Sequence, residues 1–132
     1  MIKFTYEQII WLTGNDVLNN GRQLFAKEYP LDTAYKMGVL YDNLLGFHKE
    51  VIAPKISEFY KQYGSYDVKK GVWKVYPIKE KEFDKVLEDY VKTEVDFNFE
   101  KIKMEEIAML LWTPNEVNIL RLSGLAEELN FG

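Results

Sequence analysis

The sequence predicts an α+β fold in which a long kinked helix packs with shorter helices and a small two- or three-stranded sheet. The first of three supporting observations is a helical stripe of apolar residues that runs for about 30 residues. The others are an alternating segment with a glycine turn at about residues 66–76 and a second alternating segment at about residues 94–99. No linker, repeat or low-complexity tract divides the 132 residues, so we expect residues 1–132 to form a single domain.

The first expected helix begins at Tyr6. Thr5 and Gln8 have the spacing of a capping box, in which the side chain of each residue accepts a hydrogen bond from the backbone N–H of the other. Apolar residues recur at helical spacing as far as Leu18, where an Asn-Asn-Gly sequence ends the pattern. We therefore expect a helix that begins at Tyr6 and ends near Leu18.

A second and longer helix is expected to follow the capping residue Asp32. Apolar residues continue at three- and four-residue steps to Tyr63, and Gly64 is suited to end the helix. Pro54 lies inside this stripe, where it removes one backbone hydrogen bond and pushes against the carbonyl of Glu50. Because the stripe keeps its phase across the proline, we expect one kinked helix, or two helices nearly end to end.

The segment YDVKKGVWKVYPI predicts a β-hairpin, because alternating residues flank a Lys-Lys-Gly turn. The alternation gives the second strand one face with Val72, Lys74 and Tyr76 and another face with Trp73 and Val75. A two-stranded hairpin is barely stable alone. We therefore expect one of its faces to pack on the helices while the other face, or an edge, stays accessible.

Three further elements complete the expected fold. The segment KEKEFDKVLEDYVK predicts an amphipathic helix, and the clean alternation of TEVDFNF predicts the strand at residues 94–99. A short helix is expected at residues 104–110. Thr113 and Glu116 then form a second capping box around a proline, which predicts a final helix that ends near Leu129.

Composition and charge exclude several classes of site. The chain has no cysteine, which excludes disulfides, a thiolate nucleophile and zinc sites with sulfur ligands. Its net charge of -4 comes from 17 basic and 21 acidic residues that are interspersed, and this pattern indicates neither a phosphate-binding stripe nor a nucleic-acid mimic. No secretory signal and no membrane-spanning segment is expected. We therefore expect a soluble protein of the cytoplasm.

The common catalytic motifs are missing from the sequence. HExxH, GxSxG, GxGxxG and GxxxxGK[ST] do not occur. The single histidine, His48, lies on the apolar stripe of the long helix, where a structural role is expected. We therefore expect a protein that is not an enzyme and that needs no cofactor or metal.

A small metal-dependent enzyme remains as an alternative. Carboxylates alone can bind Mg²⁺ or act as an acid and base pair. A nuclease-like cluster would consist of Glu94 and Asp96 on the strand, Asp84, Glu88 or Asp89 on the preceding helix, and Lys103 nearby. The competing interpretation of these residues is a solvated strand face.

The hairpin is the candidate binding surface. Trp73 and Tyr76 are candidate anchors, Tyr66 lies beside them, and Lys69 and Lys70 are expected at the rim. Aromatic anchors within a polar rim are typical of protein interfaces, so we expect a protein partner or self-association. Lysines beside aromatic residues are also typical of proteins that bind single-stranded nucleic acid, which is a second alternative.

The run VYPIKEKEFDKVLEDYVKTEVDFNFEKIKMEEIAMLLWTPNEVNILRLSGL, with the order of elements before it, resembles a family of small uncharacterised proteins of tailed phages. In those proteins a long helical region precedes an acidic helix, an alternating strand, an I-x-x-x-x-[IL] pattern and a final helix capped by [TS]-P-x-[DE]. The resemblance covers roughly residues 32–128 and includes no catalytic motif. It implies a non-catalytic protein of the virion or of the host cell cytoplasm. Such a protein would be a virion or assembly component, or a host-directed inhibitor of a defence system.

Overall fold

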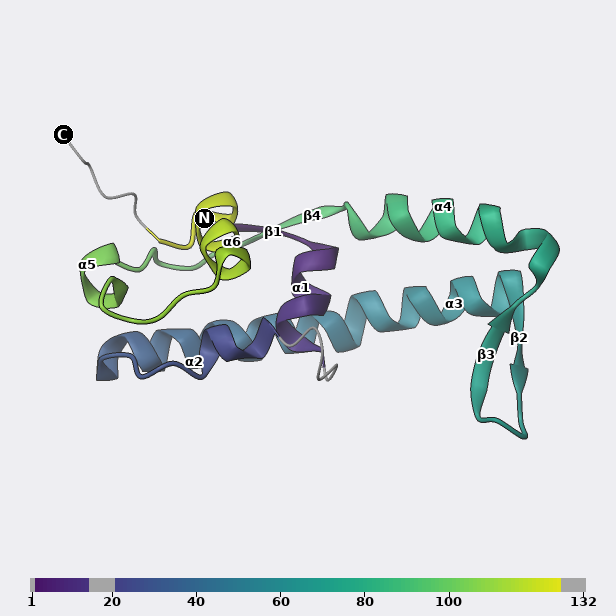
Figure 1. Ribbon diagram of the computed structural model, residues 1–132, viewed down its shortest axis with the longest axis horizontal. Coiled ribbons are helices and arrows are strands. Elements are labelled where there is room, and N and C mark those ends of the chain that lie inside the picture. The colour runs from purple at the N-terminus through teal and green to yellow at the C-terminus, as the bar shows by residue number, and fades with distance from the viewer. Residues whose placement is uncertain (1, 15–20, 127–132) are drawn as a thin grey trace.

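The computed structural model describes residues 2–14 and 21–126. Three helical segments follow each other along one side of the molecule: α2 (Leu31–Phe47), the π-helical segment η2 (His48–Ile52) and α3 (Ala53–Tyr63). Helix α4 (Glu80–Val91) runs back alongside α3, and helix α1 (Tyr6–Thr13) contacts α2, η2 and α4 (Figure 1). The predicted α+β fold class is confirmed.

The strands form two separate antiparallel pairs in the part of the chain that the structure describes. One pair joins β1 (Ile2–Thr5) to β4 (Glu94–Phe97). The other pair is the hairpin of β2 (Gly64–Asp67) and β3 (Val72–Val75). The predicted hairpin and the predicted strand are thus both present. They belong to two sheets and not to one, because β4 pairs with an N-terminal strand that the sequence did not predict.

The helical ladder widens in the turn before Pro54. The backbone N–H of Ala53 donates to the carbonyl of His48, five residues earlier. Pro54 has no N–H to donate, and in a regular helix its ring would collide with the carbonyl four residues earlier, which explains a π turn at this place. Of the two predicted forms, one kinked helix or two helices nearly end to end, the structure shows the second, because α2 and α3 follow each other through the π-helical segment η2 (Figure 1).

Both predicted capping boxes are present. The Thr5 hydroxyl accepts from the N–H of Gln8 at 3.2 Å, and the Gln8 side-chain oxygen accepts from the N–H of Thr5 at 2.9 Å. Thr113 and Glu116 exchange the same two hydrogen bonds at the start of α6 (Pro114–Ser123). Each box satisfies two backbone N–H groups that a helix start otherwise leaves without a partner.

We expect Thr5→Ala and Thr113→Ala each to lower the free energy of unfolding by about 1 kcal/mol, because each substitution removes the acceptor of one N–H in the first helical turn. Urea unfolding of the two variants measures this loss. Thr5→Ser and Thr113→Ser keep the accepting oxygen and serve as controls with nearly wild-type stability. Alanine variants as stable as the serine variants would contradict the role of the caps.

Four helix boundaries differ from those predicted, and one of them is the end of α5 (Met104–Ile107), which was expected at residue 110. Asp32 does not cap α2, because the helix begins after Pro30 and Asp32 lies in its first turn. Helix α1 ends at Thr13, and the rest of the helix expected there lies outside the described residues. Helix α6 ends well before Leu129, because Gly124 adopts a φ of 73°, a left-handed conformation that stops the helix.

The main hydrophobic core lies where α1, α2 and α6 meet the β1–β4 pair. The buried residues of this core are Ile2, Phe4, Ile9, Leu12, Leu24, Met37, Leu40, Leu44, Ile52, Ile102, Ile107, Ile119, Leu120, Leu125 and Ala126. Three short elements complete the fold: η1 (Gly21–Phe25), η3 (Pro77–Lys79) and α5 (Met104–Ile107). A separate aromatic group lies near the end of α3, where the ring of Phe83 contacts those of Tyr60 and Tyr63. This aromatic group supports the hairpin.

Candidate functional site

The hairpin joins α3 without a linker. Gly64 is the residue after the last residue of α3 and is also the first residue of β2. A Cβ atom on Gly64 would lie 2.1 Å from the carbonyl oxygen of Lys74, so the close approach of the two strands requires glycine here. The N–H of Tyr76 donates to the carbonyl of Tyr63 at 2.9 Å. The hairpin is therefore fixed by backbone pairing to the last residue of the helix.

Asp67 organises the turn of the hairpin. Its Oδ1 atom accepts from the N–H groups of Lys69 and Lys70 at 3.0 and 3.2 Å, and its Oδ2 atom lies 3.6 Å from the Nζ atom of Lys74. Gly71 completes the turn with a φ of 66°. Lys74 compensates the charge of Asp67, whereas no ion pair found among the described residues includes Lys69 or Lys70. The turn therefore carries a net positive charge.

The two faces of β3 differ in burial as the alternation predicts. Trp73 is half-buried, and its ring centroid lies 6.5 Å from that of Tyr60 on α3 and 5.4 Å from that of Tyr66 on β2. Tyr66 and Tyr76 are 50% and 44% exposed. Trp73 thus helps to hold the hairpin on α3, while the two tyrosines leave aromatic surface exposed.

The five residues predicted as a binding site lie on or next to the hairpin. They are Tyr66, Lys69, Lys70, Trp73 and Tyr76. Figure 1 shows the hairpin extending away from the end of α3, clear of the other helices. We call residues 66–78 the hairpin surface.

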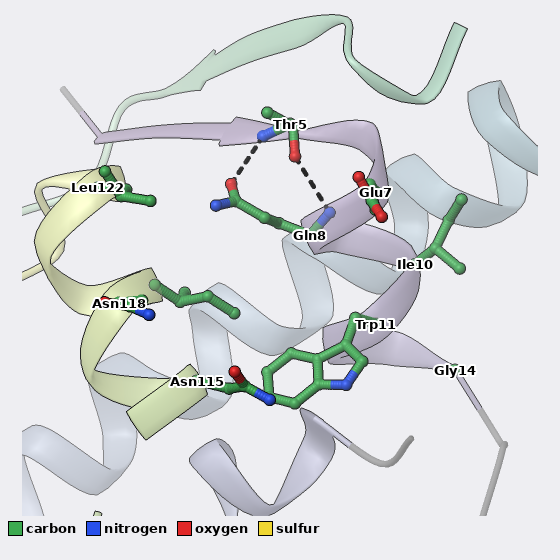
Figure 2. Close-up of a pocket in the computed structure, with 10 residues that line it drawn as sticks. Thr5, Glu7, Gln8, Ile10, Trp11, Gly14, Asn115, Asn118 and Leu122 are labelled. Carbon is green, nitrogen blue, oxygen red and sulfur yellow. Dashed lines mark hydrogen bonds between the residues drawn. The ribbon is translucent and has the colours of Figure 1, made fainter. Parts of the chain in front are cut away.

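A groove between α1 and α6 is a second candidate site, which the sequence did not predict (Figure 2). Its volume is about 790 Å³. The lining residues are Thr5, Glu7, Gln8, Ile10, Trp11, Gly14, Asn115, Asn118, Ile119 and Leu122. The two helices are far apart in the sequence, so no local pattern indicates that they face each other.

Most of the surface of the groove is apolar, as in many binding pockets, although five of its ten lining residues have polar side chains. Figure 2 shows Trp11 on α1 and Leu122 on α6 lining opposite walls. Leu122 is 65% exposed, so its side chain has surface left to cover. Of the described residues that line the groove, Glu7 alone is ionisable, and Asn115 and Asn118 add amide groups. This lining offers apolar contact together with hydrogen-bonding groups and one carboxylate.

The carboxylates of the metal-dependent alternative do not gather at one place. Glu94 pairs with Lys3 across the β1–β4 sheet at 3.4 Å, and Glu88 pairs with Lys92 at 3.0 Å. Within residues 2–14 and 21–126, no group of three or more acidic or histidine side chains is placed to hold a metal ion. The described part of the chain therefore offers this alternative no site.

His48 has a structural partner. Its Nδ1 atom lies 2.8 Å from the hydroxyl of Thr13, and that hydroxyl donates to the carbonyl of Ile9 at 2.7 Å. Because the single hydroxyl proton goes to Ile9, the Nδ1–H group of His48 is the donor to Thr13. Burial lowers the pKa of His48 below its ordinary value, which favours the neutral imidazole. These contacts agree with the structural role expected for this residue.

No family model, curated protein or solved structure matches this chain. Within the two described ranges, no helix has both the length and the hydropathy that a membrane span requires.

Proposed function

We propose that this chain is a non-catalytic protein that binds another protein through the hairpin surface. The observation that carries the proposal is the concentration of accessible apolar side chains on this segment. Of the 13 large hydrophobic residues exposed in the described part of the chain, five lie within residues 66–78, namely Tyr66, Val68, Val72, Tyr76 and Ile78. Accessible apolar surface beside charged residues is typical of protein interaction sites.

The hairpin surface is also ordered before any partner binds. Asp67 and Gly71 fix the turn, and the contact of Trp73 with Tyr60 fixes the hairpin on α3. A surface that is already ordered loses little conformational entropy on binding, which favours affinity. The positive charge of the turn favours a partner that has acidic groups near an apolar pocket.

We expect Tyr66→Ala/Tyr76→Ala to weaken partner binding by at least about thirtyfold, because the loss of one aromatic anchor alone commonly costs about 2 kcal/mol. The melting temperature should stay close to that of the wild type, since both side chains are about half exposed and neither belongs to the buried core. The tagged protein is purified from the cells in which it is naturally made, its partners are identified by mass spectrometry, and their affinities are measured by calorimetry.

Tyr35→Ala is the matched control for this experiment, because Tyr35 is an exposed tyrosine on α2, away from the hairpin. Partners that bind the double variant and the control with equal affinity would show that the hairpin surface is not the binding site.

The resemblance to tailed-phage proteins suggests two kinds of partner. A virion or assembly component stays with phage particles, whereas an inhibitor of a defence system stays with a host complex in the cytoplasm. Sedimentation of particles from infected cells, followed by detection of the tagged chain in the pellet and in the supernatant, distinguishes the two. A chain found with neither particles nor a host complex would contradict both forms of the proposal.

Single-stranded nucleic acid is the second candidate ligand, because Lys69 and Lys70 lie beside exposed aromatic rings. Proteins of that kind follow the nucleic-acid backbone with a positively charged groove, whereas Lys69 and Lys70 lie together at one turn. Fluorescence anisotropy with a labelled oligonucleotide at low salt tests this alternative. Binding that is abolished by Lys69→Glu/Lys70→Glu and by high salt would favour it over protein binding.

A further inference from the structure

We propose that the groove between α1 and α6 binds the hairpin tip, residues 67–71, of a second copy of this chain. The inference rests on the proposed function of the hairpin, and it names an identical chain as one of the proteins that the hairpin binds. Its basis is that the tip and the groove have complementary charge and that both expose apolar surface.

The hairpin tip places an apolar side chain next to positive charge. Val68 is 82% exposed, and Lys69 and Lys70 follow it directly. Asp67 does not cancel these two charges, because its own carboxylate is paired with Lys74 at 3.6 Å. The tip is thus a basic and apolar projection whose turn is held by hydrogen bonds to Asp67.

The groove has the opposite charge. Glu7 is its ionisable residue in the described part of the chain, and Trp11 and Leu122 supply apolar walls. Lys92 is paired with Glu88 at 3.0 Å, and no ion pair found among the described residues includes Glu7. An aliphatic side chain followed by an ammonium group therefore matches both the walls and the carboxylate of the groove.

The tip and the groove of one chain lie apart. The hairpin extends from the end of α3, whereas α6 lies toward the other end of the molecule (Figure 1). The contact must therefore form between copies, with each copy offering one tip and one groove. Such a heterologous contact produces open chains or closed rings of copies. Because only the hairpin tip enters the groove, the contact is small and weak. Assembly therefore depends on protein concentration.

Disulfide trapping tests the contact directly, because the chain has no cysteine. Val68→Cys protein is mixed with Leu122→Cys protein under mild oxidation, and both positions are exposed enough to keep the fold. A disulfide forms only when the two Cα atoms come within about 7 Å. We expect at least about tenfold more crosslinked heterodimer than with Ile78→Cys and Leu122→Cys, a pair in which the thiol lies beside the hairpin but not on its tip.

Sedimentation velocity tests the role of charge. We expect Lys69→Glu/Lys70→Glu and Glu7→Lys each to raise the self-dissociation constant about tenfold or more. The protein that carries all three substitutions should regain association, because both charges are reversed. Lys81→Glu/Lys85→Glu on α4 makes the same change in net charge away from the tip and should associate like the wild type.

A wild-type chain that stays monomeric, or equal trapping of the test pair and the control pair, would overturn the inference. Self-association that is lost in Lys69→Glu/Lys70→Glu but unaffected by Glu7→Lys would overturn the assignment of the groove and leave the proposed function of the hairpin standing. If Tyr66→Ala/Tyr76→Ala also leaves all partner binding intact, the proposed function fails as well.

Discussion

Phe4→Ala is expected to lower the free energy of unfolding by about 3–5 kcal/mol. Phe4 is 1% exposed and lies in β1 opposite Val95 of β4. Its ring centroid is 6.1 Å from that of Phe97, so the substitution leaves a cavity beside the strand pair. Because a domain of this size is stable by only about 5–15 kcal/mol, the variant would lose a large part of its stability. Urea unfolding followed by circular dichroism measures the loss.

Tyr35→Ala is the control for this prediction as well. It also removes an aromatic ring, but from a side chain on α2 that is 75% exposed, so its effect should stay within about 0.5 kcal/mol. A loss below about 1 kcal/mol for Phe4→Ala would contradict the position of β1 in the folded core. The difference between Phe4→Ala and Tyr35→Ala separates the effect of losing a buried ring from the effect of replacing any aromatic residue by alanine.

The parts of the fold that the sequence predicted depend on neighbouring residues. The capping boxes at Thr5 and Thr113 join residues three apart, and the hairpin turn at Gly71 joins residues four apart. The interruption before Pro54 follows from the missing N–H of that residue. The candidate residues of the hairpin lie together for the same reason, because two adjacent strands and a short turn carry all of them.

The parts that the sequence did not predict depend on contacts between distant segments. Only Ile2 and Phe4 alternate in β1 before the Thr5 cap, which is too short a pattern to predict a strand, and its partner β4 lies far along the chain. The groove likewise brings Trp11 of α1 to Leu122 of α6. Trp11 lies in a helix that the sequence predicted, but its contact with α6 could not be predicted, because the two helices are far apart in the chain.

The buried ion pair between Lys27 and Glu116 should produce the second large effect on stability. Glu116 is 3% exposed, and its Oε1 atom lies 3.2 Å from the Nζ atom of Lys27 and accepts the N–H of Thr113 at 2.9 Å. Its Oε2 atom is buried with no hydrogen-bond partner. Burial, and then the negative charge of Glu116, raise the pKa of the Tyr29 hydroxyl. Lys27 therefore compensates a charge that little else around it neutralises.

We expect Lys27→Met to lower the free energy of unfolding by about 3–5 kcal/mol, because a buried carboxylate is left without its cation. Adding Glu116→Gln to Lys27→Met should restore most of this loss, since glutamine is neutral and its oxygen can still accept the Thr113 N–H that completes the capping box. A double-mutant cycle in urea measures the coupling between the two residues. If Lys27→Met alone were as stable as the wild type, or if the second substitution made the loss larger, the pair would not be compensating a buried charge. The stability of α6, and with it one wall of the groove, would then depend on the core residues beneath the helix and not on Lys27.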